Sequence, residues 1–212
     1  MSDTSVFNTF SKAWDLAFSD FWPFFAVILL VGIIDFVSSV FSSGNNFHIG
    51  LFVISMVLGF FISRPIKMSS DWVFLKAARK DDYEILDMFS VFKRNYWNAV
   101  GASFLSLLFV GLGLILLIIP GIIIGIRLVF VPYLVIDKKL GAMAAIKASW
   151  EMSRGYSWKI FGMSLLSILI AIAGILVLIV GVLVSAVWIS SAFAVLYNSI
   201  SLKRDKVGIA KK

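Results

Sequence analysis

Apolar positions dominate three long stretches of the chain that contain no Asp, Glu, Lys or Arg. The stretches are 36–63, 95–126 and 160–202, with lengths of 28, 32 and 43 residues. Each is longer than the roughly 18 apolar residues that indicate a membrane span. As a single helix the longest would measure about 64 Å, about twice the hydrocarbon thickness of a bilayer, so it is expected to cross twice.

Polar or helix-breaking residues are expected to divide the regions around the other two stretches. A turn is expected at 42–46 (SSGNN), and Pro120, Gly121 and Pro132 are expected to hinge the helices that follow. Because backbone in lipid must satisfy its own hydrogen bonds, the spans are helices. The sequence predicts an all-α, polytopic membrane helix bundle with six transmembrane helices arranged as three hairpins. The predicted spans are about 23–42, 48–64, 98–119, 121–136, 159–179 and 182–202.

Shorter segments show the apolar periodicity of amphipathic helices. In residues 1–22, apolar side chains recur every three or four positions, at Val6, Phe10, Trp14, Phe18 and Phe21. This pattern predicts a cytoplasmic amphipathic helix lying on the inner membrane surface. Segments 68–80 and 140–154 are similar. Packing on the underside of the bundle and docking of a partner are alternative roles for these helices.

Composition agrees with a membrane protein, and charge orients it. The chain is 60% hydrophobic, has a mean hydropathy of +0.99 and carries a net charge of +7. Of its 19 Lys and Arg residues, 18 fall in segments 1–22, 64–96, 137–159 and 203–212, on one side of the predicted bundle. The positive-inside rule then predicts a multi-pass cell-membrane protein with both termini in the cytoplasm. Membrane lipids are the expected partners of these charges, and nucleic acid is not.

A repeated pattern relates two of the predicted hairpins. The pattern Trp-x3-Gly-x-Ser-x-Leu-Ser-x-Leu begins at Trp97 and again at Trp158, and the ungapped segments 97–137 and 158–198 share nine of 41 residues. We interpret them as an internal repeat within one integral membrane domain spanning 1–212. Trp14, Trp22, Trp97 and Trp158 are expected to anchor the bundle at the interface.

Segment 116–155, LLIIPGIIIGIRLVFVPYLVIDKKLGAMAAIKASWEMSRG, resembles bacterial six-span membrane proteins of the YciC-like family and the related membrane domain found beside some glycerophosphoryl diester phosphodiesterases. The positions that carry the resemblance are Pro120, Gly121, Arg127, Pro132, Asp137, Ala145 and Ser149. The resemblance covers most of the chain after residue 85 and implies the fold, but no activity.

The chain offers little material for catalysis. It has no Cys and a single His, His48, in a polar turn. The acidic residues between 81 and 87 are flanked by Lys and Arg and are expected to form a solvated surface. Neither a metal site nor a phosphate-binding loop is predicted, so no cofactor, catalytic residue or enzymatic activity is expected.

Two charges fall deep in the predicted spans. Counting residues from the helix ends places Asp35 and Arg127 at depths in the membrane that agree within about 3 Å. An unpaired charge there would cost at least about 2.5 to 3.5 kcal/mol, so the two are predicted to pair. We expect a non-enzymatic membrane protein with a lipid-associated or envelope role, which could also bind another membrane protein or itself. A small transporter using an intramembrane Asp/Arg site is the alternative.

Overall fold

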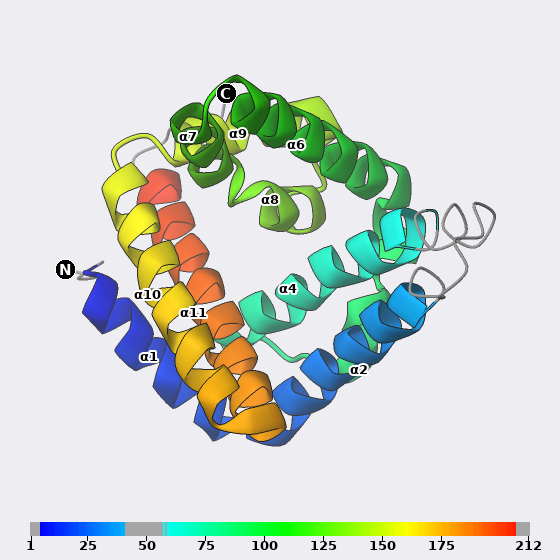
Figure 1. The fold of residues 1–212 in the computed structure, drawn as a ribbon, viewed down its shortest axis with the longest axis vertical. Helices are drawn as coiled ribbons and strands as arrows, with labels where there is room; N and C mark the ends of the chain where they lie inside the picture. The colour runs from blue at the N-terminus through cyan, green and yellow to red at the C-terminus, as the bar shows by residue number, and fades with distance from the viewer. Residues whose placement is uncertain (1–4, 41–56, 58, 207–212) are drawn as a thin grey trace.

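The computed structural model describes residues 5–40, 57 and 59–206 (Figure 1), and all of the described elements are helices. The predicted outer turn at 42–46, His48 and most of the predicted span 48–64 lie outside the described residues. The helices are α1 (Val6–Ser19), α2 (Phe21–Val40), η1 (Gly59–Ser63), α4 (Arg64–Arg79), η2 (Ile85–Phe89), α5 (Val91–Arg94), α6 (Tyr96–Leu116), α7 (Ile118–Leu128), α8 (Val131–Asp137), α9 (Ala142–Met152), α10 (Ser157–Leu176) and α11 (Leu178–Lys206).

The predicted all-α class is confirmed, with four helical segments long and apolar enough to cross a membrane: Tyr96–Leu116, Ile118–Asp137, Ser157–Leu176 and Gly181–Arg204. A fifth candidate is the pair α1 and α2, if the two helices, bent by 95° at their junction, form one broken span. The described part of the chain therefore contains four or five candidate spans, against the six expected from the sequence.

Two hairpins, α6–α7 and α10–α11, are closed by glycine. A Cβ atom added to Gly113 would lie 2.9 Å from the Cα of Gly121, and one added to Gly174 would lie 2.7 Å from the carbonyl oxygen of Gly181. Only glycine allows backbones to approach this closely. Gly113 and Gly174 are equivalent positions in the predicted repeat, so its two halves turn by the same means.

The turn of the first hairpin precedes the predicted hinge. Leu117 separates α6 from α7 and has an extended conformation, and its N–H donates to the Gly113 carbonyl at 3.0 Å. Pro120 lies within the first turn of α7, where the missing N–H of proline costs nothing because it would have no helical partner. Gly121 supplies the close contact rather than the turn itself.

The predicted span 121–136 is a broken helix. Helix α7 ends at Leu128, and α8 begins at Val131 with Pro132 in its first turn. Figure 1 shows α8 inside the ring formed by the longer helices, next to α4. Because proline cannot donate to the preceding turn, the helical hydrogen bonding is interrupted immediately before it, within the candidate span Ile118–Asp137.

The N-terminal helix α1 packs on α11. Phe10 and Ala13 are buried, and the indole N–H of Trp188 donates to the Phe10 carbonyl at 3.0 Å. The rings of Phe10 and Trp14 contact that of Trp188 at centroid distances of 5.7 and 4.8 Å. Of the roles considered from sequence, the structure therefore shows packing against the bundle.

Helix α4 crosses the middle of the molecule (Figure 1) and buries Val73, Phe74 and Leu75 completely. It packs against α11, α8, η2, α6 and α2. The amphipathic periodicity predicted at 68–80 is confirmed as a helix, but it lies between other helices rather than on an outer surface. Two groups of its polar residues, one near each end, form the sites described next.

Candidate functional site

At its C-terminal end, α4 forms an ion pair that joins three helices. The Arg79 Nη1 and Nη2 atoms donate to the two carboxylate oxygens of Asp137, at the end of α8, at 2.6 and 2.7 Å. Tyr197 of α11 donates its hydroxyl to Asp137 Oδ2 at 2.8 Å. The neighbouring Asn198 accepts from Arg79 Nε at 3.4 Å and donates to the Ala78 carbonyl at 3.2 Å. We call Arg79, Asp137, Tyr197 and Asn198 the polar junction.

The polar junction is well satisfied and mostly buried. The Asp137 side chain is 7% exposed and that of Arg79 is 23% exposed. The hydrogen bonds that Arg79 donates to Asp137 raise the pKa of Arg79, so the guanidinium remains charged. A bidentate pair with both carboxylate oxygens engaged leaves little capacity for a ligand. Asp137 and Asn198 are the aligned ends of the predicted repeat, and both contact Arg79.

Ser149 of α9 bridges the break between α7 and α8. Its hydroxyl donates to the Arg127 carbonyl at 2.7 Å and accepts from the Phe130 N–H at 3.3 Å. These are the groups left without helical partners by the break, and they would be costly to bury unpaired. Ser149 and Ala145 are both 0% exposed. Three of the residues behind the family resemblance, Asp137, Ala145 and Ser149, thus hold the α4, α8 and α9 region together.

Arg127 and Asp35 are not brought together. Arg127 places its guanidinium carbon 5.7 Å from the ring centroid of Trp150, and its Nη1 atom is buried without a hydrogen-bond acceptor among the described residues. Asp35 is exposed on α2, which lies across the molecule from α7 (Figure 1). The described ion pairs do not include one between them. The predicted pair is therefore not among the described contacts, because equal depth in a bundle does not place two residues on adjacent helices.

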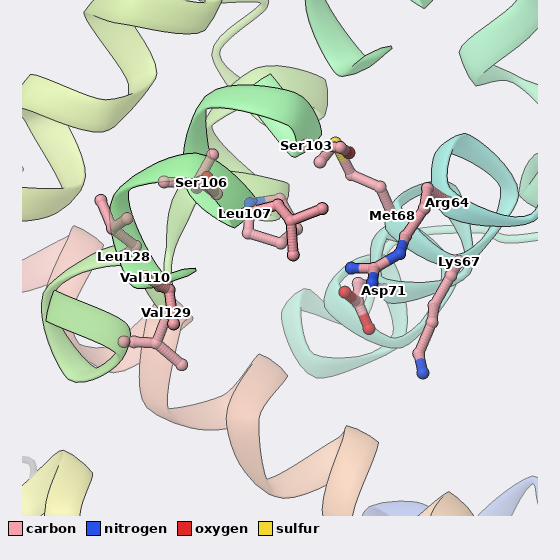
Figure 2. A pocket seen from close by; sticks show the side chains of 13 residues that line it. Arg64, Lys67, Met68, Asp71, Ser103, Ser106, Leu107, Val110, Leu128 and Val129 are labelled. Carbon is pink, nitrogen blue, oxygen red and sulfur yellow. The ribbon is translucent and has the colours of Figure 1, made fainter. Parts of the chain in front are cut away.

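A pocket of about 380 Å³ opens between α4, α6 and the α7–α8 break (Figure 2). Its polar side chains are Arg64, Lys67 and Asp71 from α4 and Ser103 and Ser106 from α6. Its remaining wall is apolar and is formed by Met68, Leu107, Val110, Gly125, Leu128, Val129, Val131 and Pro132. The combination of a few polar groups with an apolar wall is typical of sites for small or amphiphilic ligands.

The charged groups of the pocket lack ion-pair partners among the described residues. Arg64 and Lys67 are exposed, whereas Asp71 is half-buried. Figure 2 shows the Arg64 guanidinium and the Asp71 carboxylate pointing into the same space, facing Leu107. Burial raises the pKa of Asp71 to about 7, against a smaller lowering effect from Lys67. Near neutral pH this carboxyl can therefore exchange a proton.

The serine wall of the pocket has free hydrogen-bonding capacity. Ser103 is 9% exposed, and the Ser106 hydroxyl oxygen is buried with no hydrogen-bond partner among the described residues. A buried hydroxyl without a partner is uncommon in proteins, because its desolvation is not compensated. A polar ligand atom in the pocket would satisfy it.

The remaining predicted residues lie on the surface. Trp22, Trp97 and Trp158 are 75%, 75% and 85% exposed, as side chains at an interface would be. Trp14 is 44% exposed and packs partly against Trp188.

Sequence reasoning missed the pocket, although a signal for it exists. Arg64, Lys67, Met68 and Asp71 follow the three- and four-residue spacing of one helix face. Ser103 and Ser106 belong to the repeated pattern that begins at Trp97. The two polar faces could be recognised separately, but their meeting across α4 and α6 depends on the tertiary fold.

No family model matches the chain, and no solved structure matches it significantly.

Proposed function

We propose that this chain is a non-enzymatic, multi-pass membrane protein that holds an amphiphilic molecule, a membrane lipid, in the pocket between α4, α6, α7 and α8. The observation that carries the proposal is the composition of the pocket. Cationic and hydroxyl groups lie on two of its walls, and an apolar wall of a size suited to an alkyl chain completes it. A lipid has a matching polar headgroup followed by apolar acyl chains.

We further propose six spans in three hairpins with both termini in the cytoplasm, for which the one-sided charge distribution is the support. In this orientation Arg64 and Lys67 lie at the inner membrane surface. Tags at 45 and 180 should then report outside, and tags at the termini and at 82 should report inside. An external C-terminus would contradict this arrangement. We also propose a shared architecture with the YciC-like family, which the buried positions of Asp137, Ala145 and Ser149 favour.

Mass spectrometry of the protein extracted from membranes tests the lipid-holding function. We expect a lipid to remain bound to the native chain under mild extraction. Replacement of Leu107 and Val110 by Gln should remove that lipid, because both side chains form the apolar wall of the pocket. Replacement of the exposed Leu112, on the same helix but outside the pocket, by Gln is the matched control. Retention of the lipid by the pocket variant would contradict the proposal.

A transporter is the second candidate, and one observation favours it. The pocket adjoins the break between α7 and α8, and broken helices beside a binding site are common in transporters. Reconstituted vesicles distinguish the two: a holding protein should leave the distribution of labelled lipid between leaflets unchanged, whereas a transporter should accelerate its exchange. Acceleration that disappears when Leu107 and Val110 are replaced would establish transport through this site.

A further inference from the structure

We propose, on the basis of the lipid-holding function above, that the pocket selects a phosphate anion through Arg64 and Lys67, and that protonation of Asp71 strengthens its binding. The same anion chemistry could come from the headgroup of an anionic lipid or from free phosphate, and the experiment below includes both. The proposal deepens the proposed function by naming the ligand chemistry and its control by pH.

The selection of an anion rests on two cations that line the pocket. Arg64 and Lys67 lie three residues apart on α4, so they share one helix face and both line the pocket. Neither forms an ion pair with another described residue, in contrast to Lys76 and Arg79 farther along α4. Arg and Lys are the side chains that most often bind phosphate, Arg through its fork of N–H groups and Lys as a point charge.

The opposite wall of the pocket fits a phosphate ester. The Ser106 hydroxyl is buried and unpartnered, and it lies across the pocket from the α4 cations. An ester or glycerol oxygen of a headgroup could accept a hydrogen bond from this hydroxyl while the phosphate binds Arg64. The apolar side chains Leu107, Val110, Leu128 and Val129 continue from this point and would contact the acyl chains.

Asp71 competes with the anion for the same cations. Its carboxylate points into the space that the Arg64 guanidinium occupies (Figure 2), and an ionised carboxylate there would repel a phosphate. A protonated Asp71 removes this repulsion and can donate a hydrogen bond to a phosphate oxygen. Burial raises the pKa of this carboxyl to about 7, so the exchange falls in the physiological range.

The other ionisable groups around Asp71 allow this control to operate. On α4 itself, Arg64 and Lys67 line the same pocket, and from α8 the phenol of Tyr133 is close enough to interact electrostatically with Asp71. The polar groups that helix α6 contributes to the pocket are the hydroxyls of Ser103 and Ser106, which do not ionise near neutral pH. Asp87 of η2 is engaged by Lys76, and Asp137 of α8 by Arg79. Asp71 is therefore the carboxylate that faces the pocket cations among the described residues.

The test is a titration of the full-length protein in an uncharged detergent with three probes: short-chain phosphatidylglycerol, phosphatidylcholine with the same chains, and inorganic phosphate. Calorimetry at pH 6 and pH 8 gives the affinities. The diester headgroup of phosphatidylglycerol does not titrate between these values, so any pH dependence comes from the protein. We expect phosphatidylglycerol to bind at least about tenfold more tightly than phosphatidylcholine, since only the former is a net anion.

Variants assign the effects to residues. Arg64→Gln with Lys67→Gln should abolish the preference for the anionic lipid, whereas Arg154→Gln, which removes an exposed charge outside the pocket, should retain it. The native affinity should fall about tenfold between pH 6 and pH 8, because the protonated fraction of a group with a pKa near 7 falls by that factor. Asp71→Asn should bind equally well at both pH values, and Asp15→Asn, on the exposed side of α1, should behave as the native protein.

The outcomes separate the two proposals. Equal binding of the two lipids would overturn the selection of anions and leave the lipid-holding function intact. Binding of neither lipid would overturn both. Free phosphate binding as tightly as phosphatidylglycerol would identify an inorganic anion as the ligand, which supports the site chemistry and contradicts the lipid source. A pH dependence of binding that persists in Asp71→Asn would overturn the role of Asp71. This variant retains both Arg64 and Lys67, so it tests Asp71 separately from the cations.

Discussion

The two ends of α4 carry similar residues in opposite states. At the C-terminal end, Arg79 is held by both oxygens of Asp137, and Tyr197 and Asn198 complete the polar junction. At the N-terminal end, Arg64, Lys67 and Asp71 share a pocket without forming an ion pair among the described residues. One helix therefore presents one polar cluster whose hydrogen-bonding capacity is used and one whose capacity is free, and their nearest members, Asp71 and Arg79, are about two turns apart.

This difference indicates which cluster has a structural role and which can bind a ligand. When one member of a buried, fully hydrogen-bonded ion pair is removed, the charge of the other member is left uncompensated, so the substitution should destabilise the fold. A charge that faces an open pocket costs little to remove but remains available to a ligand. Polar groups in this protein should thus be sorted by whether their hydrogen-bonding capacity is used, rather than by residue type or depth.

The largest expected effect comes from breaking the polar junction. Asp137→Asn keeps the size of the side chain but leaves the Arg79 guanidinium without a counter-charge at a site where the native carboxylate is only 7% exposed. We expect a loss of about 3 kcal/mol in the free energy of unfolding. Thermal unfolding in detergent, followed by tryptophan fluorescence, measures it.

The control for this prediction is the other ion pair of α4. Lys76 and Asp87 are 2.8 Å apart with side chains 20% and 25% exposed, so Lys76→Ala should cost less than about 1 kcal/mol. Equal effects of the two substitutions would show that the polar junction is no more important than a surface pair, and the comparison between the ends of α4 would lose its basis.

The sequence predicts the individual helices better than their neighbours. Predicted spans 98–119 and 159–179 correspond to α6 and α10, because an uninterrupted apolar run has few alternatives to a helix. The break before Pro132 was predicted only as a hinge, since its geometry depends on Ser149, which lies 19 residues beyond Phe130 in the chain. Such long-range hydrogen bonds have no local signal.

The candidate sites were harder to predict, for the same reason. The pairing of Asp35 with Arg127 was inferred from depth alone, and two residues at one depth can lie anywhere around the bundle. Asp137 was recognised as part of a motif, but its partner Arg79 belongs to a segment that had been assigned only amphipathic character. A charge near a helix end has several possible partners in the sequence, and the packing of the helices determines which of them it contacts.

Removing the bridge at the helix break should have the second-largest effect. Ser149→Ala leaves the Phe130 N–H without its acceptor, at a position that is 0% exposed, and leaves the Arg127 carbonyl with only the long hydrogen bond of 3.5 Å from the Ser153 hydroxyl. We expect a loss of about 2 kcal/mol, because buried polar groups left unpaired cost about 1 to 3 kcal/mol. Ser164→Ala is the matched control, since the Ser164 hydroxyl donates only to the carbonyl one turn earlier in its own helix, Ile160. A Ser149→Ala variant as stable as this control would show that the hydrogen bonds of Ser149 at the helix break do not contribute to stability.

A stability measurement across pH examines the N-terminal end of α4. The pKa of Asp71 is raised from 3.8 to about 7 in the folded protein. The folded state then binds a proton that the unfolded state has lost, so this group makes stability fall as pH rises from about 4 to about 7. Asp71→Asn cannot ionise and should be more stable than the native protein at pH 8, by about 1 to 2 kcal/mol, because solvent reaches the pocket and screens the charge.

The advantage of Asp71→Asn should disappear below about pH 3, where the native carboxyl is protonated in both states because the pH is then below even the unfolded-state pKa of 3.8. Asp15→Asn, at an exposed position of α1, should follow the native curve throughout. If Asp71→Asn instead destabilised the protein at pH 8, the carboxylate would be paired in solution. Both ends of α4 would then carry charges that are paired within the protein.

The smallest expected effect is at the contact between α1 and α11, where the hydrogen-bonding capacity is used but only weakly needed. Trp188→Phe removes the bond from the indole N–H to the Phe10 carbonyl and retains most of the ring contact with Phe10. That carbonyl lies within α1, where a helical N–H can still satisfy it, so the loss should be about 0.5 to 1 kcal/mol. Trp158→Phe, at a side chain that is 85% exposed, should have no measurable effect on thermal unfolding. A loss above about 2 kcal/mol for Trp188→Phe would mean that a carbonyl with a second donor is as costly to abandon as the Phe130 N–H that Ser149→Ala leaves unpaired, contrary to the ranking that places Ser149 above Trp188.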